Sequence, residues 1–415
     1  MPERCAILGG YQTDFARNTA KEGVDIADLM AEAVAGTLRA AGIAASEIDV
    51  VHVGNAFGQL MTGQGHLGAM PATVEPGLAG VPASRHEAAC ASGGIALLAA
   101  MADLESGRYD TALVLGIEVE RACGGTRAAE LMAAAGWVGR EAAGVQFMWP
   151  WAFDTIAATY AERFGLDEAH LHAIGELNLH NAKANPLAQT RAWAIGPIDD
   201  DLTNPYLQGR LRRYDCSQIT DGAVGVVLAS PRAARRLGHA ELSVVAGWGH
   251  RTVGLPLAPK LSTTASAGAI EGDSRRAAGL VMPHVADTVT DAFGRAGVTD
   301  VWQLDAIETH DCFTPSEYLA IDHFGITPPG QSWRAIEDST IERSGRLPIN
   351  PSGGLIGVGH PVGATGVRMV LDAHRQVTGT AGDYQIPGAE RVGTLNIGGS
   401  TATTVAFVLT GPELG

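Results

Sequence analysis

Two stretches in which glycines lead into a helical pattern decide the fold. Residues 359–372 read GHPVGATGVRMVLD, and residues 87–94 read EAACASGG directly before a helical pattern at 94–104. The surrounding segments match as well. From about Glu241 the chain repeats the earlier order of strand, helix, strand, glycine-opened helix and closing strands, with little residue identity. This pattern predicts two duplicated α/β halves.

Short apolar runs bounded by turn formers predict the strands of both halves. Because these runs are apolar almost throughout and helical patterns separate them, we expect a mostly parallel sheet covered by helices on both faces. One helix, at 26–41, ends at Gly42, and a helix of the second half lies at 284–296. The strands are expected at 4–9, 48–53, 111–117 and 223–228 in the first half, and at 242–246, 304–308, 392–397 and 402–409 in the second.

The stretch from 121 to 214 breaks this alternation. It shows no clear strand and holds four of the seven tryptophans, which are Trp137, Trp149, Trp151 and Trp193. Long excursions of this kind usually form lids or binding loops. We therefore expect three parts: a first half at 1–120 completed by 215–240, an insertion at 121–214, and a second half at 241–415.

Composition places the chain among globular proteins with a substantial core. Of its 415 residues 46% are hydrophobic and 18% are charged, which excludes disorder over most of the chain. Lys plus Arg number 29 against 45 Asp plus Glu, which gives a formal charge of −16. Because that average charge repels a polyanion, we expect no nucleic-acid partner.

Cysteine usage and the N-terminal residues predict a cytoplasmic protein. Five cysteines without any CxxC spacing indicate free thiols in a reducing compartment. The first residues lack the basic and apolar regions of a signal peptide, and no window of about 18 residues is apolar enough to span a membrane. His170 and His172 stand on different faces of a helical stretch, so we expect no metal site.

Cys90 is the first candidate for chemistry. It precedes a helix whose unpaired N–H groups and positive dipole end are expected to stabilise a thiolate. Small neighbours, among them Ala89, Ala91 and Gly93, let a substrate approach the sulfur, and the N–H of Cys90 could serve as an oxyanion donor. The alternative is a small cysteine buried in the core.

His310 and Cys312 form the second candidate, in the segment HDCF at the end of an expected strand. Residues two apart on an extended segment point to the same side, so both side chains could face one cleft. Strand ends are where open α/β sheets place their sites. A histidine near a cysteine also arises by chance, so this segment alone decides nothing.

Two glycine-rich segments complete the set. Residues 350–366 do not fit a dinucleotide-binding fingerprint, because the third glycine of GxGxxG would fall on Val362. We expect their glycines instead to hold His360 at a fixed angle, where it could take a proton from a thiol. In residues 396–400, NIGGS, the glycines could turn a second N–H into the cleft. A hairpin is the simpler explanation for that last segment.

Together these four segments resemble the thiolase superfamily, and more narrowly its sterol carrier protein type. The signatures are Cys90-Ala91-Ser92, His310-Asp311-Cys312-Phe313, Gly359-His360-Pro361 and Ile397-Gly398-Gly399, and the resemblance covers nearly the whole chain. It implies the thiolase fold, a layered αβαβα arrangement of duplicated halves. It also implies acyl transfer between a cysteine thioester and coenzyme A, with condensation to, or thiolytic cleavage of, 3-ketoacyl-CoA.

The resemblance implies a role for each residue. Cys90 would carry the acyl group, His360 would take its proton, and His310 would fix a water or the thioester oxygen. The N–H groups of Cys90 and Gly398 would form a second oxyanion hole. Thiolases outside this subtype carry a second cysteine in the last motif; this chain has Asn396 there, so Cys312 would be the acid/base thiol.

The resemblance also implies partners. We expect an acyl-CoA substrate, no permanently bound cofactor, and a homodimer or homotetramer. The residues that bind the CoA nucleotide are not readable from the sequence; Arg121, Arg127, Arg140 and Arg213 flank or lie in the insertion and are candidates. Three alternatives remain: a C-acyltransferase with a non-CoA acceptor, a CoA-ester aldolase with a small OB-fold zinc-binding partner, and a non-catalytic scaffold.

Overall fold

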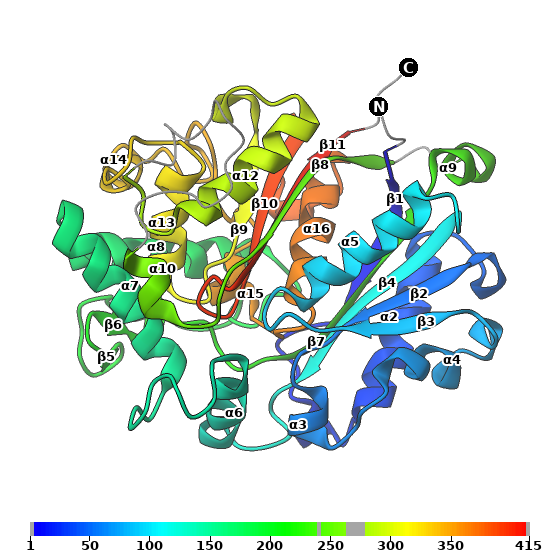
Figure 1. The fold of residues 1–415 in the computed structure, drawn as a ribbon, viewed down its shortest axis with the longest axis horizontal. Coiled ribbons are helices and arrows are strands. Elements are labelled where there is room, and N and C mark those ends of the chain that lie inside the picture. Colours follow the sequence, from blue (N-terminus) through cyan, green and yellow to red (C-terminus); the bar gives the residue numbers. More distant parts are fainter. Residues whose placement is uncertain (1–3, 239–241, 263–278, 412–415) are drawn as a thin grey trace.

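Nine strands form one continuous sheet in the computed structural model, which describes residues 4–238, 242–262 and 279–411. The strand order is β3-β2-β4-β7-β1-β8-β11-β10-β9 (Figure 1). The strands are β1 (Ala6–Gln12), β2 (Val50–Gly54), β3 (Ala83–His86), β4 (Thr111–Val119), β7 (Asp221–Ala229), β8 (Ser243–Thr252), β9 (Ala306–Thr309), β10 (Arg391–Gly398) and β11 (Thr403–Thr410).

The strand order shows the duplication. Read outward from the centre, the first half runs β1, β7, β4, β2 and the second runs β8, β11, β10, β9, with matching directions at each step. The halves are joined where β1 pairs with β8 through Ala6 and Val244. The expected strands and helices therefore recur in both halves, although the boundary expected near Glu241 lies outside the described residues.

Helices separate and cover the two halves of the sheet. On the outside, α2 (Ile26–Ala40) packs on β1 and β7, and α12 (Pro283–Ala296) packs on β8 and β11. Between the halves lie α5 (Ser92–Glu105) and α16 (Thr365–Val377), which contact each other as well as the strands (Figure 1). Every residue of α16 except Arg375 is buried. The layers are thus α, β, α, β, α, which is the arrangement that the resemblance implies.

The expectation of a mostly parallel sheet is wrong. Only β2–β3, β2–β4 and β9–β10 pair in parallel, whereas the five other neighbours are antiparallel. In both halves the last strand returns antiparallel to both of its neighbours: β7 lies between β4 and β1, and β11 lies between β8 and β10. An apolar run indicates that both faces of a strand are covered. It does not indicate the direction of the strand, because covered strands of either direction are apolar.

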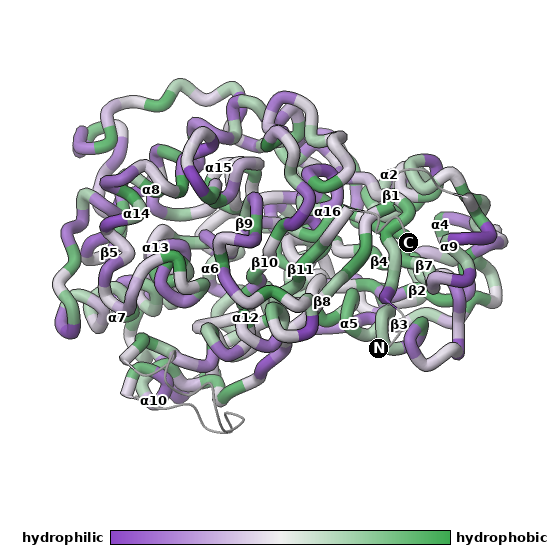
Figure 2. The backbone as a smooth tube through the Cα atoms, turned by 90° about the horizontal axis from the view of Figure 1, so that it is seen from above, coloured by the Kyte–Doolittle hydropathy of each residue, from purple (hydrophilic) through white to green (hydrophobic). Residues whose placement is uncertain are grey.

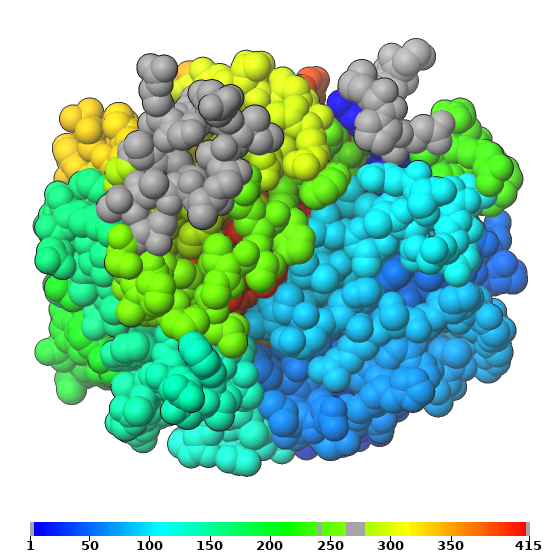
Figure 3. All heavy atoms as spheres, viewed as in Figure 1, coloured from blue at the N-terminus to red at the C-terminus, as the bar shows by residue number. Residues whose placement is uncertain are grey.

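The insertion consists mainly of three helices, of which the first packs near α3 (Gly58–Thr62) of the first half and the other two lie beside the second half. They are α6 (Gly125–Met132), α7 (Met148–Phe164) and α8 (Glu168–Asn181). A short hairpin of β5 (Tyr206–Gln208) and β6 (Leu211–Arg212) follows, which corrects the expectation of no strand there. In Figure 3 the insertion, coloured cyan to green, covers the lower left of the molecule.

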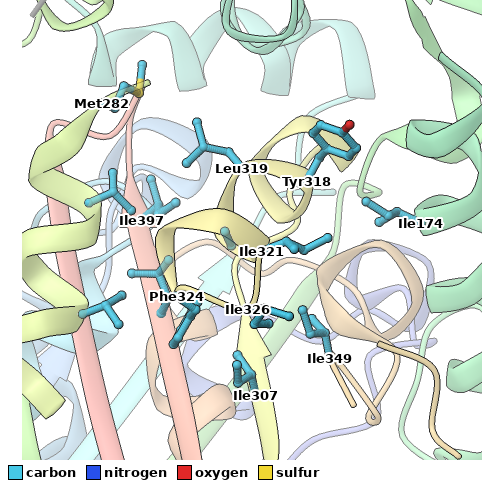
Figure 4. Packing of buried hydrophobic residues seen from close by; sticks show 14 of the residues in the cluster. Ile174, Met282, Ile307, Tyr318, Leu319, Ile321, Phe324, Ile326, Ile349 and Ile397 are labelled. Atoms are coloured by element: carbon cyan, nitrogen blue, oxygen red, sulfur yellow. The ribbon is translucent and has the colours of Figure 1, made fainter. Parts of the chain in front are cut away.

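The core of the second half extends into the insertion. Figure 2 shows hydrophobic residues along the central strands and hydrophilic ones mainly in outer loops. Ile174 of α8 belongs to the same buried cluster as Ile307, Tyr318 and Ile349, and Figure 4 shows these side chains gathered around one helix. This shared apolar core anchors the insertion. Within the described ranges every helix falls short of the length and hydrophobicity that crossing a membrane requires.

A buried cluster of charged side chains lies next to the HDCF and GHP segments. Arg368 of α16 is fully buried, and its Nη1 lies 2.6 Å from Asp372 Oδ2, 3.5 Å from Glu308 Oε2 and 3.0 Å from Ser352 Oγ. Burial raises the pKa of Glu308 to about 7, while the Arg368 charge acts to lower it. The arginine therefore compensates a carboxylate only two residues from His310.

We expect Arg368→Met to destabilise the fold by about 3–5 kcal/mol, because it leaves a buried carboxylate without its counter-ion. The deficit should shrink as the pH falls, since the pKa of an unpaired Glu308 rises and the group takes up a proton. Urea unfolding at two pH values measures this. Arg17→Met, which removes a partly exposed pair with Glu22 and Glu32, should cost about 1 kcal/mol or less. Equal losses in the two variants would contradict the prediction.

Candidate active site

Cys90 stands on a strained turn between β3 and α5. Ala89, directly before it, has a φ of +50°, a left-handed conformation that an alanine rarely adopts. The Ser92 hydroxyl holds the turn, since it accepts from Ala88 N at 2.9 Å and donates to Ala89 O at 2.6 Å. The serine of the CxS signature therefore supports the turn that presents the thiol, a role that the sequence did not reveal.

The HDCF segment follows β9 and is tied to the glycine-rich segment by Asp311. The buried Asp311 carboxylate accepts from Leu355 N at 2.6 Å and Ile356 N at 3.1 Å, at the start of α15 (Gly354–Val358). Asn178 of the insertion donates to the same carboxylate at 2.9 Å. Asp311 thus fixes the flanking His310 and Cys312 relative to the segment that carries His360.

Glu120, just beyond β4, holds the loop of His360. Its carboxylate accepts from Val362 N at 2.8 Å and from Thr220 N at 3.0 Å, and the Thr220 hydroxyl accepts from His360 N at 3.0 Å. Sequence reasoning missed Glu120 and also Glu118, whose carboxylate accepts from Gly363 N of the same loop at 3.0 Å. The available signal was a pair of carboxylates two residues apart at the end of the apolar strand TALVLGIEVE.

The three segments bring Cys90, His310 and His360 together. One ligating atom of each residue lies within 4.8 Å of the others, and the two imidazoles meet edge to face with centroids 5.2 Å apart. Cys312 opens on the same cavity of about 350 Å³ as Cys90 and His360. A thiol and two imidazoles are also a donor set that zinc accepts, which spacing along the sequence did not show. His170 and His172 instead contact Glu337 and Asp215 separately.

Hydrogen bonds assign the tautomer of His360. Its Nδ1 lies 2.7 Å from Thr365 Oγ1, and that hydroxyl lies 3.1 Å from Pro361 O, to which it donates. Because a hydroxyl has one proton, His360 Nδ1 must be the donor to Thr365. The lone pair is then on Nε2, which is buried and has no hydrogen-bond partner among the described residues. This nitrogen is free to accept a proton.

The thiol and the imidazoles are neutral at rest, which corrects the expected stabilisation of a thiolate. Burial first, then the charge of Glu120, raise the pKa of Cys90 to about 12, although N–H groups of Gly399 and Cys90 itself oppose this. Burial and the Arg368 charge lower the pKa of His360 to about 3. Burial likewise holds the pKa of His310 well below its usual value. Burial therefore outweighs the effect of the helix terminus on the pKa of Cys90.

We expect alkylation of Cys90 by iodoacetamide to accelerate about tenfold per pH unit from pH 7 to 10, because only the thiolate reacts and the raised pKa keeps it scarce. Peptide mass spectrometry after timed quenching measures the modification at Cys90 separately from Cys123, which is also partly exposed. A rate that is flat across this range would show a preformed thiolate and contradict the neutral resting state.

The Gly398 region closes the site from the other side. A side chain on Gly398 would collide with Ala88 O, so the glycine lets β10 approach the Cys90 turn. The N–H that reaches the Cys90 sulfur belongs to the next residue, Gly399, which lines the cavity. Asn396 donates to Cys90 O at 3.0 Å.

Aromatic residues of the insertion wall the cavity. Phe147, Trp149 and Phe153 line it from the insertion, and Phe57 and Phe313 from the two halves. The insertion is therefore part of the site and not only packing.

Of the four arginines considered for the CoA nucleotide, Arg121 is held by the backbone carbonyls of Arg17 and Ile219. Arg127 pairs with exposed Glu130, and Arg140 and Arg213 lie over tryptophan rings. Arg127, Arg140 and Arg213 remain candidates for binding the CoA nucleotide, because their contacts lie at the surface, where a ligand can reach them.

Comparisons with known families and curated proteins give the following similarities. Residues 5–195 match the family model described as thiolase, N-terminal domain, and residues 271–411 match the model described as thiolase C-terminal domain-like. The chain is 31% identical to acetyl-CoA acetyltransferase of Methanothermobacter thermautotrophicus over 97% of this chain and 98% of that one. It is 27% identical to human sterol carrier protein 2 over 97% of this chain and 71% of the relative.

Solved structures share the fold at lower identity. The Ltp2-ChsH2(DUF35) aldolase has a TM-score of 0.76 at 20% identity, and the match covers 100% of this chain and 99% of that chain. Human mitochondrial 3-ketoacyl-CoA thiolase in complex with CoA has a TM-score of 0.68 at 15% identity, covering 99% and 98%.

Proposed function

The chain belongs to the thiolase family and is a thiolase-type acyltransferase, and on this premise we propose that it cleaves or forms 3-ketoacyl thioesters of coenzyme A at Cys90. An acetyl-CoA acetyltransferase or 3-ketoacyl-CoA thiolase activity is the finer assignment. Coenzyme A acts as a substrate and not as a resident cofactor.

In the cleavage direction, the first step makes one carbon–sulfur bond and breaks one carbon–carbon bond. His360 Nε2 takes the Cys90 proton while the sulfur attacks the keto carbon. The bond to the α-carbon then breaks, and its electrons form the enolate of acetyl-CoA. Cys312 donates a proton to that α-carbon, which leaves an acyl group on Cys90.

The second step transfers the acyl group to free coenzyme A. His360 first passes its proton to the Cys312 thiolate, which returns both groups to their neutral state. His360 Nε2 then takes the proton of the CoA thiol as the CoA sulfur attacks the thioester carbonyl, and it passes that proton to Cys90, which leaves as the thiol. Both steps place negative charge on a thioester oxygen, which preorganised N–H donors stabilise in a site with little water. Condensation is the same sequence in reverse.

The shared cavity of Cys90 and Cys312 is the observation that carries the proposal. Hydrolysis of a thioester needs one thiol and one base, whereas carbon–carbon chemistry also needs an acid/base group at the α-carbon. The Cys312 thiol is 5% exposed and has its pKa raised mainly by burial, then by Cys90. It is therefore a protonated thiol that can supply a proton.

Turnover of 3-ketoacyl-CoA esters of graded chain length tests the function, with consumption of free CoA and formation of acetyl-CoA both measured. The apolar cavity of about 350 Å³ supports faster cleavage of esters with acyl chains longer than that of acetoacetyl-CoA. Consumption of ester without acetyl-CoA formation, or no turnover of any ester, would contradict the proposal.

A CoA-ester aldolase is the second candidate, because the Ltp2-ChsH2(DUF35) aldolase shares the fold. The thiol pair argues against it, since a retro-aldol cleavage needs no cysteine nucleophile. Release of an aldehyde or ketone from a 3-hydroxyacyl-CoA, together with co-purification of a small zinc-binding protein, would favour this candidate. A thiolase-like C-acyltransferase would instead acylate an acceptor other than coenzyme A.

A dimer of this chain is also proposed. β3 stands at the edge of the sheet, with Ala83 and Ser84 exposed and its outer side unpaired within the described residues. An open edge strand is a template for pairing with a second copy, and the Cys90 turn follows it directly. Light scattering with size exclusion measures the state; a monomer at working concentration would contradict this.

A further inference from the structure

Asn396 lies between Cys90 and His310. Its side chain is 2% exposed, and its Nδ2 lies 3.0 Å from Cys90 O and 3.4 Å from His310 Nδ1. One amide nitrogen has two protons, so it can donate to both groups at once. This residue stands where thiolases outside the sterol carrier protein type carry a second cysteine.

The orientation of the amide is decided by its neighbours. Cys90 O is a carbonyl and can only accept, so Nδ2 and not Oδ1 must face it. Oδ1 lies on the other side, where a side chain on Gly366 would collide with it and one on Gly94 would come within 3.0 Å. Glycines of α5 and α16 thus clear the space that lets the amide keep this orientation.

The amide in turn determines where His310 carries its proton. A neutral imidazole has one N–H and one lone pair, and its protonation state here is neutral. Because Nδ1 faces an N–H of Asn396, the lone pair is on Nδ1 and the proton on Nε2. His360 has the opposite tautomer, with its lone pair on Nε2. The two rings at the site are thus one donor and one acceptor.

We propose that Asn396 is a positioning residue that fixes His310 as the Nε2–H tautomer and so makes it a hydrogen-bond donor to the thioester oxygen. This rests on the proposed function for its consequence in catalysis, although the tautomer itself does not. No bond to carbon changes and no proton is lost; the amide selects one of two isomers of the same neutral ring. His360 then acts as the base, and His310 acts as the hydrogen-bond donor.

Asn396→Asp is the decisive variant, because a carboxylate accepts a proton from His310 Nδ1 and moves the lone pair to Nε2. We expect kcat for 3-ketoacyl-CoA cleavage to fall about 10²-fold, as for loss of one oxyanion donor, with KM changed little. Asn396→Leu keeps the volume without selecting a tautomer and should lose less. Asn204→Asp is the matched control. Asn204 is also buried, and its side chain donates to a backbone carbonyl, Ile198 O, at 2.7 Å, but it contacts neither Cys90 nor His310.

Nitrogen-15 NMR of histidine-labelled protein reads the tautomer directly, with His310→Gln used to assign the signals. In the unsubstituted chain Nδ1 should resonate as an unprotonated and Nε2 as a protonated ring nitrogen, and Asn396→Asp should exchange them. A protonated Nδ1 in the unsubstituted chain would overturn the proposal, even if no variant folds. An equal loss of kcat in Asn396→Leu and Asn396→Asp would overturn it as well. If no 3-ketoacyl-CoA is cleaved while Nε2 is protonated, the proposed function fails and the tautomer assignment stands.

Discussion

Replacing Cys90 by alanine is expected to reduce 3-ketoacyl-CoA cleavage by at least about 10³-fold, because the substitution removes the atom that accepts the acyl group. The fold should change little, since Cys90 is partly exposed and alanine fits on the turn that Ser92 holds. The measurement is initial rate of acetyl-CoA formation at saturating ester. Incubation with acetyl-CoA should add an acetyl group to the unsubstituted chain and none to the variant.

Cys123→Ala is the matched control for this variant. Cys123 is also partly exposed and packs in the same small cluster as Cys90, but it does not line the cavity. Its replacement should leave the rate within about twofold, because it removes no group that the proposed reaction uses. Undiminished turnover by Cys90→Ala would exclude the covalent mechanism at Cys90.

Cys312→Ser is expected to separate the two halves of the reaction. Acylation of Cys90 by acetyl-CoA should persist, because it needs only the nucleophile, His360 and the oxyanion donors. Cleavage of the carbon–carbon bond should fall about 10²–10³-fold, since a hydroxyl is a much weaker acid than a thiol at the α-carbon. Mass spectrometry of the acyl-enzyme and the rate of acetyl-CoA formation measure the two steps separately.

Cys216→Ser is the control for Cys312→Ser. Cys216 is buried and lines the same cavity, and its thiol lies 3.4 Å from Arg212 O, outside the catalytic group. Its substitution should change both steps by only a few-fold. If Cys312→Ser cleaved 3-ketoacyl-CoA at the normal rate, Cys312 would not be the acid, and another group would have to protonate the α-carbon.

The candidate site residues were recognisable from the sequence because each motif has a local cause. Cys90 stands before a helix among small residues, and His360 stands in a segment whose glycines, such as Gly353 and Gly359, adopt positive φ values that other residues rarely adopt. Local patterns of this kind depend on backbone freedom within a few residues, so a sequence carries them directly. The duplication was visible for the same reason, as a repeated order of apolar runs and glycine-opened helices.

The protonation states were not recognisable, and one expectation about them was wrong. The helix terminus at Cys90 is a local feature that favours a thiolate. The burial and the neighbouring Glu120 that raise its pKa come from packing against segments that are distant in sequence. Desolvation acts through the whole surrounding volume, which exists only when the chain is folded.

The sequence by itself determined the family, the two halves and the set of Cys90, His310, Cys312 and His360. Only the tertiary structure decided the direction of the strands, the aromatic wall supplied by the insertion, and the opposite tautomers of His310 and His360. The physical reason is the range of the interactions. Turns and helix starts form between neighbours in the chain, whereas cavity walls and shared protons depend on contacts such as that of Asn396 with Cys90, across 306 positions.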